Sequence, residues 1–343
     1  MSMKYGISLP QIWMLLGGTK DPVQAYEAMT RVAQTADECG YETVWLSDHF
    51  HYGGLGPMTV PPSEDLMFEC WTTTAALARD TTRVRIGQVV TCNGYRNPAL
   101  LAKMASTVDV LSHGRLTLGI GAGDFEHEFR AYGYACPPAP ERLRQLREAV
   151  QILLAMWTED EATFEGTYYQ VRGAINQPKG VQQPHIPLLI GGTGEKVTLK
   201  LVAQYADVCE VPLGDTTWRS SEPGLGAQPP KREGGLGPAF IEHKYAVLKA
   251  HCEAMGRDYE SIHRVAAAVC IIGDTDEEAR AATPETIKAQ VGDALDAALI
   301  GSPETIRRRI AAYEAVGVQE LRLGFLDAVH LESIRRFAKE FIA

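Results

Sequence analysis

Thr43-Val-Trp-Leu-Ser-Asp-His-Phe50 is the stretch of this chain that says most about its fold. Its first four residues form the short apolar run that is typical of a buried parallel strand. An acid and an imidazole, Asp48 and His49, follow the run directly. In α/β barrels the catalytic side chains stand at the carboxyl ends of such strands and face one cavity. We therefore predict that this strand end is one of eight around a barrel.

Strand and helix patterns alternate along the rest of the chain. Helices are expected between the strands, for example from Asp21-Pro22 to Cys39 and from Asn97-Pro98 to Ser112, each with proline in its first turn. Eight alternations favour an α/β fold, a (β/α)8 TIM barrel, over an open doubly wound sheet. The expected strands are Tyr5–Leu9, Thr43–Ser47, Arg83–Thr91, Arg115–Gly121, Pro187–Ile190, Asp207–Val211, Val265–Ile272 and Glu320–Gly324.

Two segments depart from this alternation. Residues 159–186 contain an alternating stretch that predicts a hairpin with its turn at Glu165-Gly166. Residues 214–239 are rich in glycine and proline and lack periodicity, which is typical of a lid or a binding loop. Because no linker separates two cores, we treat residues 1–343 as one barrel domain with these two insertions.

Composition limits the possible partners. The formal net charge of −10 argues against nucleic acid or an anionic membrane surface, since both attract basic patches. We see no apolar run of membrane-spanning length and no signal segment before the first strand. Seven scattered cysteines without a C-x-x-C pair are typical of a reducing compartment. We expect a cytoplasmic protein whose partner is a small molecule.

Small and polar residues gather at the expected strand ends. Gly191-Gly-Thr-Gly194 lies between a strand and a helix, where glycines let backbone N–H groups approach an anion. We interpret it as a phosphate cradle, with a plain tight turn as the alternative. Gly119-Ile-Gly-Ala-Gly123 lacks the G-x-G-x-x-G spacing of a dinucleotide fingerprint. It indicates instead a close approach by a ligand or a neighbouring strand.

The imidazoles next to Asp48 allow two further interpretations. His49 and His51 form an H-x-H pattern, which is a metal-ligand pattern in barrel hydrolases. A metal ion needs three or four converging ligands, and His127 is the only other histidine near a strand end. We therefore expect no metal and favour proton transfer by His49, whose ordinary pKa lies near physiological pH. A capping Asp48 and a packed His49 remain the purely structural alternative.

Four stretches together resemble the luciferase-like oxidoreductases, the luciferase-like monooxygenase superfamily. The Ser-Asp-His-Phe strand end is similar to that of the branch that depends on the deazaflavin coenzyme F420. This resemblance covers residues 3–215 and the last hundred residues, and it implies a TIM barrel with insertions. The four stretches are Thr43–Phe50, Gly87–Pro98, Ser112–Gly123 and Pro187–Gly194.

The resemblance also implies roles for individual residues. Asp48 and His49 would be the catalytic residues: Asp48 would contact the deazaflavin ring or its side chain, and His49 would face the substrate as general acid or base. Val89-Val90 would form a non-prolyl cis peptide that supports the central ring. The remaining positions that would line the cofactor are Thr91, Ala122, Gly123, Asp124 and His127, and those that would hold its phosphate are Gly191, Gly192, Thr193 and Gly194. Asp124 stands where relatives often carry Trp or Glu.

These implications combine into one functional hypothesis. The protein would transfer a hydride between coenzyme F420 and a small organic substrate, with His49 moving a proton. An FMN-dependent luciferase-like monooxygenase is the nearest alternative. A metal-dependent barrel hydrolase is an alternative of another class, and a binding protein without catalysis is a third. Relatives commonly form homodimers, so a homodimer is expected.

Overall fold

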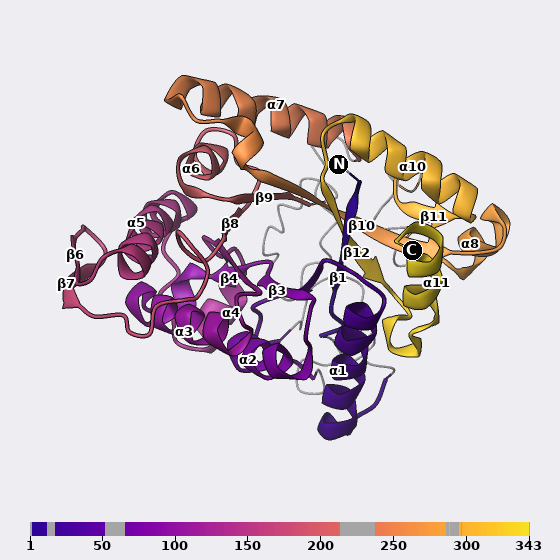
Figure 1. Ribbon diagram of the computed structural model, residues 1–343, viewed down its shortest axis with the longest axis horizontal. Helices are drawn as coiled ribbons and strands as arrows, with labels where there is room; N and C mark the ends of the chain where they lie inside the picture. Colours follow the sequence, from indigo (N-terminus) through magenta and orange to yellow (C-terminus); the bar gives the residue numbers. More distant parts are fainter. Residues whose placement is uncertain are drawn as a thin grey trace.

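Eight parallel strands close into a ring at the centre of the computed structural model, in the order β1-β2-β3-β5-β8-β9-β10-β12, with β12 pairing back to β1. The helices lie around the outside of this ring (Figure 1). The predicted (β/α)8 barrel is therefore confirmed. The structure describes residues 2–11, 18–51, 66–212, 237–285, 288, 295 and 297–342.

The predicted barrel strands are all present. The barrel strands are β1 Lys4–Ser8, β2 Thr43–Leu46, β3 Arg85–Gln88, β5 Leu116–Gly121, β8 Leu188–Gly191, β9 Val208–Val211, β10 His263–Ile272 and β12 Glu320–Phe325. Two short strands add to the sheet: β4 Thr91–Cys92 pairs with β5, and β11 Leu299–Gly301 pairs with β10. The predicted hairpin is formed by β6 Ala162–Glu165 and β7 Gln170–Ala174.

Polar residues followed by proline start several of the surrounding helices. Asp21 and Asn97 accept hydrogen bonds from the first free amides of α1 and α3, as the sequence predicts. None of the described helices is both long and apolar enough to span a bilayer. The helices are α1 Pro22–Glu38, α2 Cys70–Asp80, α3 Pro98–Leu111, α4 Glu126–Ala131, α5 Ala139–Thr158, α6 Thr198–Tyr205, α7 Pro238–Met255, α8 Asp276–Ala282, α10 Pro303–Ala315 and α11 Glu332–Phe341.

The structure differs from the sequence-based expectation in a few places. The third strand is not continuous, because a cis peptide at Val89-Val90 separates β3 from β4. The elements α4, α7, α8 and β11 were not expected. Of the insertion expected at 214–239, residues 214–236 lie outside the described residues, and Pro238 already begins α7.

Apolar side chains pack on both sides of the strand ring. Val44 and Leu46 belong to the large outer core between strands and helices. Trp45 points the other way and packs inside the barrel with Leu189 and Val265. This alternation explains why all four residues of β2 are buried.

Glycines make room for the bulky groups inside the barrel. A Cβ on Gly87 would lie 2.4 Å from the Trp45 indole, and one on Gly6 would lie 2.8 Å from its Nε1. A Cβ on Gly119 would lie 1.8 Å from the backbone oxygen of Gln88, closer than any real contact. The glycines therefore fix how closely neighbouring strands and the indole can pack.

Replacing Gly119 by Ala should destabilise the barrel, because the new methyl group meets backbone that cannot move away. We expect the free energy of unfolding to fall by about 1–3 kcal/mol, the usual cost of overpacking. Gly324→Ala is the matched control, since its Cβ would lie 4.0 Å from the nearest atom. Urea unfolding of both variants measures the difference. Equal stabilities for the two variants would contradict this packing account.

Candidate active site

The predicted site residues follow four strands that are neighbours in the barrel: β2, β3 with its continuation β4, β5 and β8. Cys92 of β4 lies opposite Gly121 of β5, and Ile190 of β8 lies opposite Ile120. The carboxyl ends of these strands therefore form one continuous part of the barrel rim. The structure thus brings the predicted positions to one face, where α/β barrels carry their active sites.

His49 is held by a glutamate that sequence reasoning did not identify. Its Nδ1 lies 2.8 Å from Oε2 of Glu128, which is on the short helix α4. A carboxylate can only accept, so Nδ1 carries the proton in this contact. The His49 side chain is 25% exposed, whereas that of Glu128 is fully buried. The ring is thus anchored from the protein side.

Glu128 collects hydrogen bonds on both of its oxygens. Oε2 also accepts from the Tyr95 hydroxyl at 2.9 Å. Oε1 accepts from the backbone N–H groups of Phe50 at 2.6 Å and of His51 at 3.1 Å. These contacts satisfy the buried carboxylate, which would otherwise be costly to desolvate.

The pairing changes the proton affinity of both partners. Burial alone would raise the pKa of Glu128, but the hydrogen bonds from His49 and the amides outweigh it and lower the pKa. Burial alone would lower the pKa of His49, but Glu128 and the charge of Asp124 outweigh it and raise the pKa. An ionised Glu128 therefore favours the protonated form of His49.

Asp48 forms a buried ion pair with Arg96, which is separate from the contact between His49 and Glu128. Arg96 Nη1 lies 2.5 Å from Asp48 Oδ2, and Nη2 lies 3.0 Å from Oδ1, so the ion pair is bidentate. The backbone N–H of Cys92 donates to Oδ2 at 3.0 Å, and Glu69 also binds Arg96. This network ties the end of β2 to β4 and to the start of α2. The expected contact of Asp48 with a deazaflavin stays a prediction.

Val89 and Val90 form the cis peptide that was expected at this position. Both side chains pack on the inner core beside Trp45. A Cβ on Gly121 or on Gly191 would lie 2.6 Å from a Val90 methyl group. Only glycine at these two positions leaves room for the Val90 side chain between β5 and β8.

The other expected lining residues differ in accessibility. Thr91 is fully buried, and its hydroxyl accepts from Trp71 Nε1 at 3.1 Å. Gly123 has φ +73° and its carbonyl accepts from Arg142, while Ala122 is half-buried. The two remaining positions, Asp124 and His127, are exposed at the rim.

The Gly191–Gly194 turn is at the end of β8, but α6 begins only at Thr198. Gly192 has φ +119°, a left-handed conformation that side chains rarely adopt. A Cβ on Gly194 would lie 3.0 Å from the Thr198 hydroxyl. The turn is compact and leaves its backbone close to the rim, as a phosphate cradle requires, but its role stays a prediction.

Arg322 of β12 reaches across the barrel interior below this rim. Its Nη1 donates to Ser8 at 2.6 Å and its Nη2 to Glu210 at 2.8 Å. Its Nε is buried and has no hydrogen-bond partner among the described residues. A buried donor without a partner is unusual in a folded protein.

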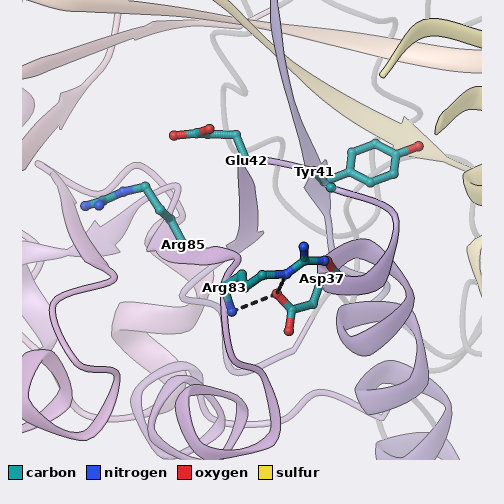
Figure 2. A pocket seen from close by; sticks show the side chains of 6 residues that line it. Asp37, Tyr41, Glu42, Arg83 and Arg85 are labelled. Carbon is teal, nitrogen blue, oxygen red and sulfur yellow. Dashed lines mark hydrogen bonds and ion pairs between the residues drawn. The ribbon is translucent and has the colours of Figure 1, made fainter. Parts of the chain in front are cut away.

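A polar hollow at the opposite, amino-terminal end of the barrel has a different character. Figure 2 shows Arg83 directed at Asp37, whereas Arg85 and Tyr41 point away from that pair. Asp37 accepts from the amides of residues 82, 83 and 84, and Arg85 donates to Leu116 and Thr117. Because these charges are used within the protein, we assign this face to stability.

No group of three or more His, Cys, Asp or Glu side chains in the described part of the chain is arranged to hold a metal ion. His51 and His127 have their ring centres 5.0 Å apart in an edge-to-face contact. That packing belongs to the aromatic surroundings of α4.

Three charged residues of the site were missed from the sequence. Arg96 and Glu69 lie in expected loop and helix ends, and no local signal assigns them to Asp48. Glu128 carries a weak signal, since an acid between Phe125 and Phe129 indicates a carboxylate held in apolar surroundings. Its partner is 79 positions away, so only the fold reveals the pair.

Comparison with known proteins identifies the family of this chain. Residues 3–215 match the family described as luciferase-like monooxygenase. The chain belongs to this family. An F420-dependent glucose-6-phosphate dehydrogenase of Amycolatopsis mediterranei (strain U-32) is 34% identical over 185 residues, which are 52% of this chain and 50% of that protein. The chain spans about half the length of the curated relatives it matches first, at 50% and 48%.

Two solved structures share the luciferase-like fold along nearly the whole chain. An F420-dependent secondary alcohol dehydrogenase in complex with an F420-acetone adduct has TM-score 0.75 and 19% identity, covering 99% of this chain and 98% of that one. The oxygenating constituent of 3,6-diketocamphane monooxygenase of Pseudomonas putida, in complex with FMN, has TM-score 0.72 and 17% identity, with coverage of 99% and 98%. At these identities the likeness supports the fold alone.

Removing Arg96 should strongly destabilise this luciferase-like barrel, because Asp48 is left buried without its counter-charge. We expect Arg96→Met to lower the free energy of unfolding by about 3–5 kcal/mol. Adding Asp48→Asn should recover part of the loss, since the buried charge is then absent. Arg83→Met is the control, with a side chain 67% exposed and an expected change of about 1 kcal/mol or less. Strict additivity of the two substitutions in urea unfolding would refute the pairing energy.

Proposed function

We propose that this protein is an F420-dependent oxidoreductase that moves a hydride between the cofactor and a small organic substrate, while His49 moves a proton. The contact of His49 with the buried Glu128 carries the proposal, because it gives the rim an oriented imidazole with a raised pKa. The family and the named functions of the matched relatives support the same conclusion. The expected homodimer and cytoplasmic location stay predictions.

The residues inside the rim fit a flat polar ring system. Val89 and Val90 offer an apolar surface at the end of β3, flanked by glycines of β5 and β8. The orphan Nε–H of Arg322 is a donor for a ring carbonyl or nitrogen. Ala122, Gly123, Asp124 and His127 would complete the cofactor lining, with the buried Thr91 behind it, and Gly191–Gly194 would hold the phosphate. When bound, the deazaflavin supplies a carbon that accepts or gives up a hydride, and the protein supplies alignment and charge.

His49 is suited to proton transfer in both directions. Glu128 fixes Nδ1 as the protonated nitrogen, so Nε2 is the atom that would exchange a proton with a substrate oxygen. In alcohol oxidation Nε2 takes the hydroxyl proton, and in carbonyl reduction it returns one. Glu128 stabilises the imidazolium form in either case, much as a buried carboxylate orients the histidine of a catalytic triad.

Asp48 holds neighbouring loops of the rim in place. Its ion pair with Arg96 and its contact with the Cys92 amide hold together the two loops that carry His49 and the end of β4. The raised pKa of Asp48 arises from burial, against which Arg96 acts. We therefore propose that Asp48 fixes the geometry of the rim and that His49 performs the proton chemistry.

The FMN-dependent monooxygenase is the second candidate, since an FMN complex shares this fold. Equilibrium binding of the purified protein to F420 and to reduced FMN, followed by fluorescence, separates the two. We expect F420 to bind at least about tenfold more tightly, a difference of about 1.4 kcal/mol. Tighter binding of FMN, together with oxygen-dependent product formation, would overturn the F420 assignment.

Substitutions at His49 and Glu128 test the proton-transfer role. His49→Ala should lower kcat by about 10²–10⁴ while the Kd for F420 stays nearly unchanged. Glu128→Gln removes the charge that raises the pKa of His49, so the inflection of the pH–rate profile should move to lower pH. The shift has the same sign for oxidation and reduction, because both report the same imidazole.

Glu126→Gln is the matched control for the glutamate variant. Glu126 lies on the same helix but pairs at the surface with Arg130 at 2.5 Å. Its substitution should leave the pH–rate profile in place. An unchanged inflection in Glu128→Gln, or the same shift in Glu126→Gln, would count against the positioning role of Glu128.

A further inference from the structure

Four aromatic rings form a wall beside His49: Phe50, Tyr95, Tyr132 and Tyr134. The Phe50 ring lies 4.2 Å from that of Tyr132 and 4.6 Å from that of Tyr95, centre to centre, with interplanar angles of 29° and 31°. Its plane is within 16° of the Tyr134 ring, 6.1 Å away. We call these four residues the aromatic wall. Their planes are inclined at small angles to one another, so the rings pack as a stack around Phe50.

The aromatic wall shares its anchor with the proton-transferring histidine. Glu128 binds His49 Nδ1, the Phe50 amide and the Tyr95 hydroxyl. Phe125 adds an edge-to-face contact with the His49 ring at 5.8 Å. The wall and the reacting imidazole are therefore fixed relative to one another.

Part of the aromatic wall is open to solvent. Tyr132 is 53% exposed and stacks against the half-buried Phe50, and Tyr134 is 36% exposed and lies against the buried Tyr95. Partly exposed aromatic rings near a reacting group are suited to bind an apolar, flat ligand. The tyrosine hydroxyls are not used in the ring contacts.

The charged side chains that the surroundings of the aromatic wall offer to a ligand are acidic. Asp124 is exposed and Glu126 is half-buried beside the buried Glu128. In the described part of the chain, the arginines next to the wall are all engaged within the protein. Arg96 binds Asp48, Arg130 binds Glu126, and Arg142 donates to the carbonyls of Gly123 and Pro137. A phosphate group needs several convergent cationic donors, and this surface offers carboxylates instead.

We propose that the substrate is an uncharged or cationic alcohol or carbonyl compound with an aromatic or similarly flat apolar group, which packs on the aromatic wall, and not a phosphate ester. The proposal rests on the proposed function and names its substrate class. In the oxidative direction the carbinol carbon gives its hydride to the cofactor, and the hydroxyl proton goes to His49. The products are the ketone and the reduced cofactor, and the reverse reaction returns both.

Turnover by the F420-loaded protein tests the proposal with three substrates: 1-phenylethanol, 2-propanol and glucose 6-phosphate. We expect kcat/KM for 1-phenylethanol to exceed that for 2-propanol by about tenfold or more, since ring burial and ring stacking both contribute. Tyr132→Ala should remove most of this preference through KM, and Tyr132→Phe should retain it. Tyr168→Ala is the matched control, on the β6–β7 hairpin, where its hydroxyl contacts Arg144; it should change nothing.

Binding of acetophenone to the cofactor-free protein gives a second readout that does not depend on turnover. Tyr132→Ala should weaken it at least about threefold, within the range of one lost ring contact. Glucose 6-phosphate as the best substrate, or equal acetophenone binding by wild type and Tyr132→Ala, overturns the proposal. So does a change in oligomeric mass in Tyr132→Ala with unchanged kcat/KM, which would make the wall a subunit contact. If the protein fails to bind F420, the proposed function falls, while acetophenone binding still decides the role of the wall.

Discussion

A fully buried carboxylate cannot remain without partners, and this requirement at Glu128 organises the rim of the barrel. The side chain gathers donors from the end of β2 and from Tyr95, so it fastens α4 over the loop that carries His49. The same contacts raise the proton affinity of His49 and set the orientation of its ring. One buried carboxylate therefore fixes the orientation and the tautomer of His49 and contributes to its raised pKa.

The interior of the barrel imposes a second constraint, which is steric. Trp45 fills the centre and is accommodated by Gly6 and Gly87, while Val90 needs glycine at positions 121 and 191. The side chains of Val89 and Val90 pack against the inner core. Arg322 adds a buried donor, its Nε, that has no hydrogen-bond partner among the described residues. Rigid support of this kind is what alignment of a cofactor requires.

The barrel itself could be predicted from the sequence, because several of its strands are short apolar runs and helices such as α1 and α3 have a clear start, although the long helix α7 was not expected. Asp21-Pro22 and Asn97-Pro98 cap their helices as expected. The break in the third strand at Val89-Val90 followed only from family resemblance, since its local pattern is that of a continuous strand. The six-residue helix α4 is too short for periodicity, and its first residue lacks a side-chain cap.

The site was predictable in part for the same physical reasons. Strand ends can be recognised locally, so His49 and the glycine turn after β8 were placed on the correct face. The partners of Asp48 and His49 come from loops and a short helix 44 to 79 positions away, and such contacts have no local signature. The aromatic wall was missed likewise, because Phe50 and Tyr132 are brought together only when Glu128 holds α4 against β2.

The central claim is that an oriented imidazole and a deazaflavin ring meet at the carboxyl end of β2 and β3. A crystal structure of the protein with bound F420 tests it most directly. We expect the ring to lie against Val89-Val90 on the side of His49, with the phosphate at Gly191–Gly194. A ring bound away from Val89-Val90, or a His49 that leaves Glu128 and faces away from the ring, would contradict it.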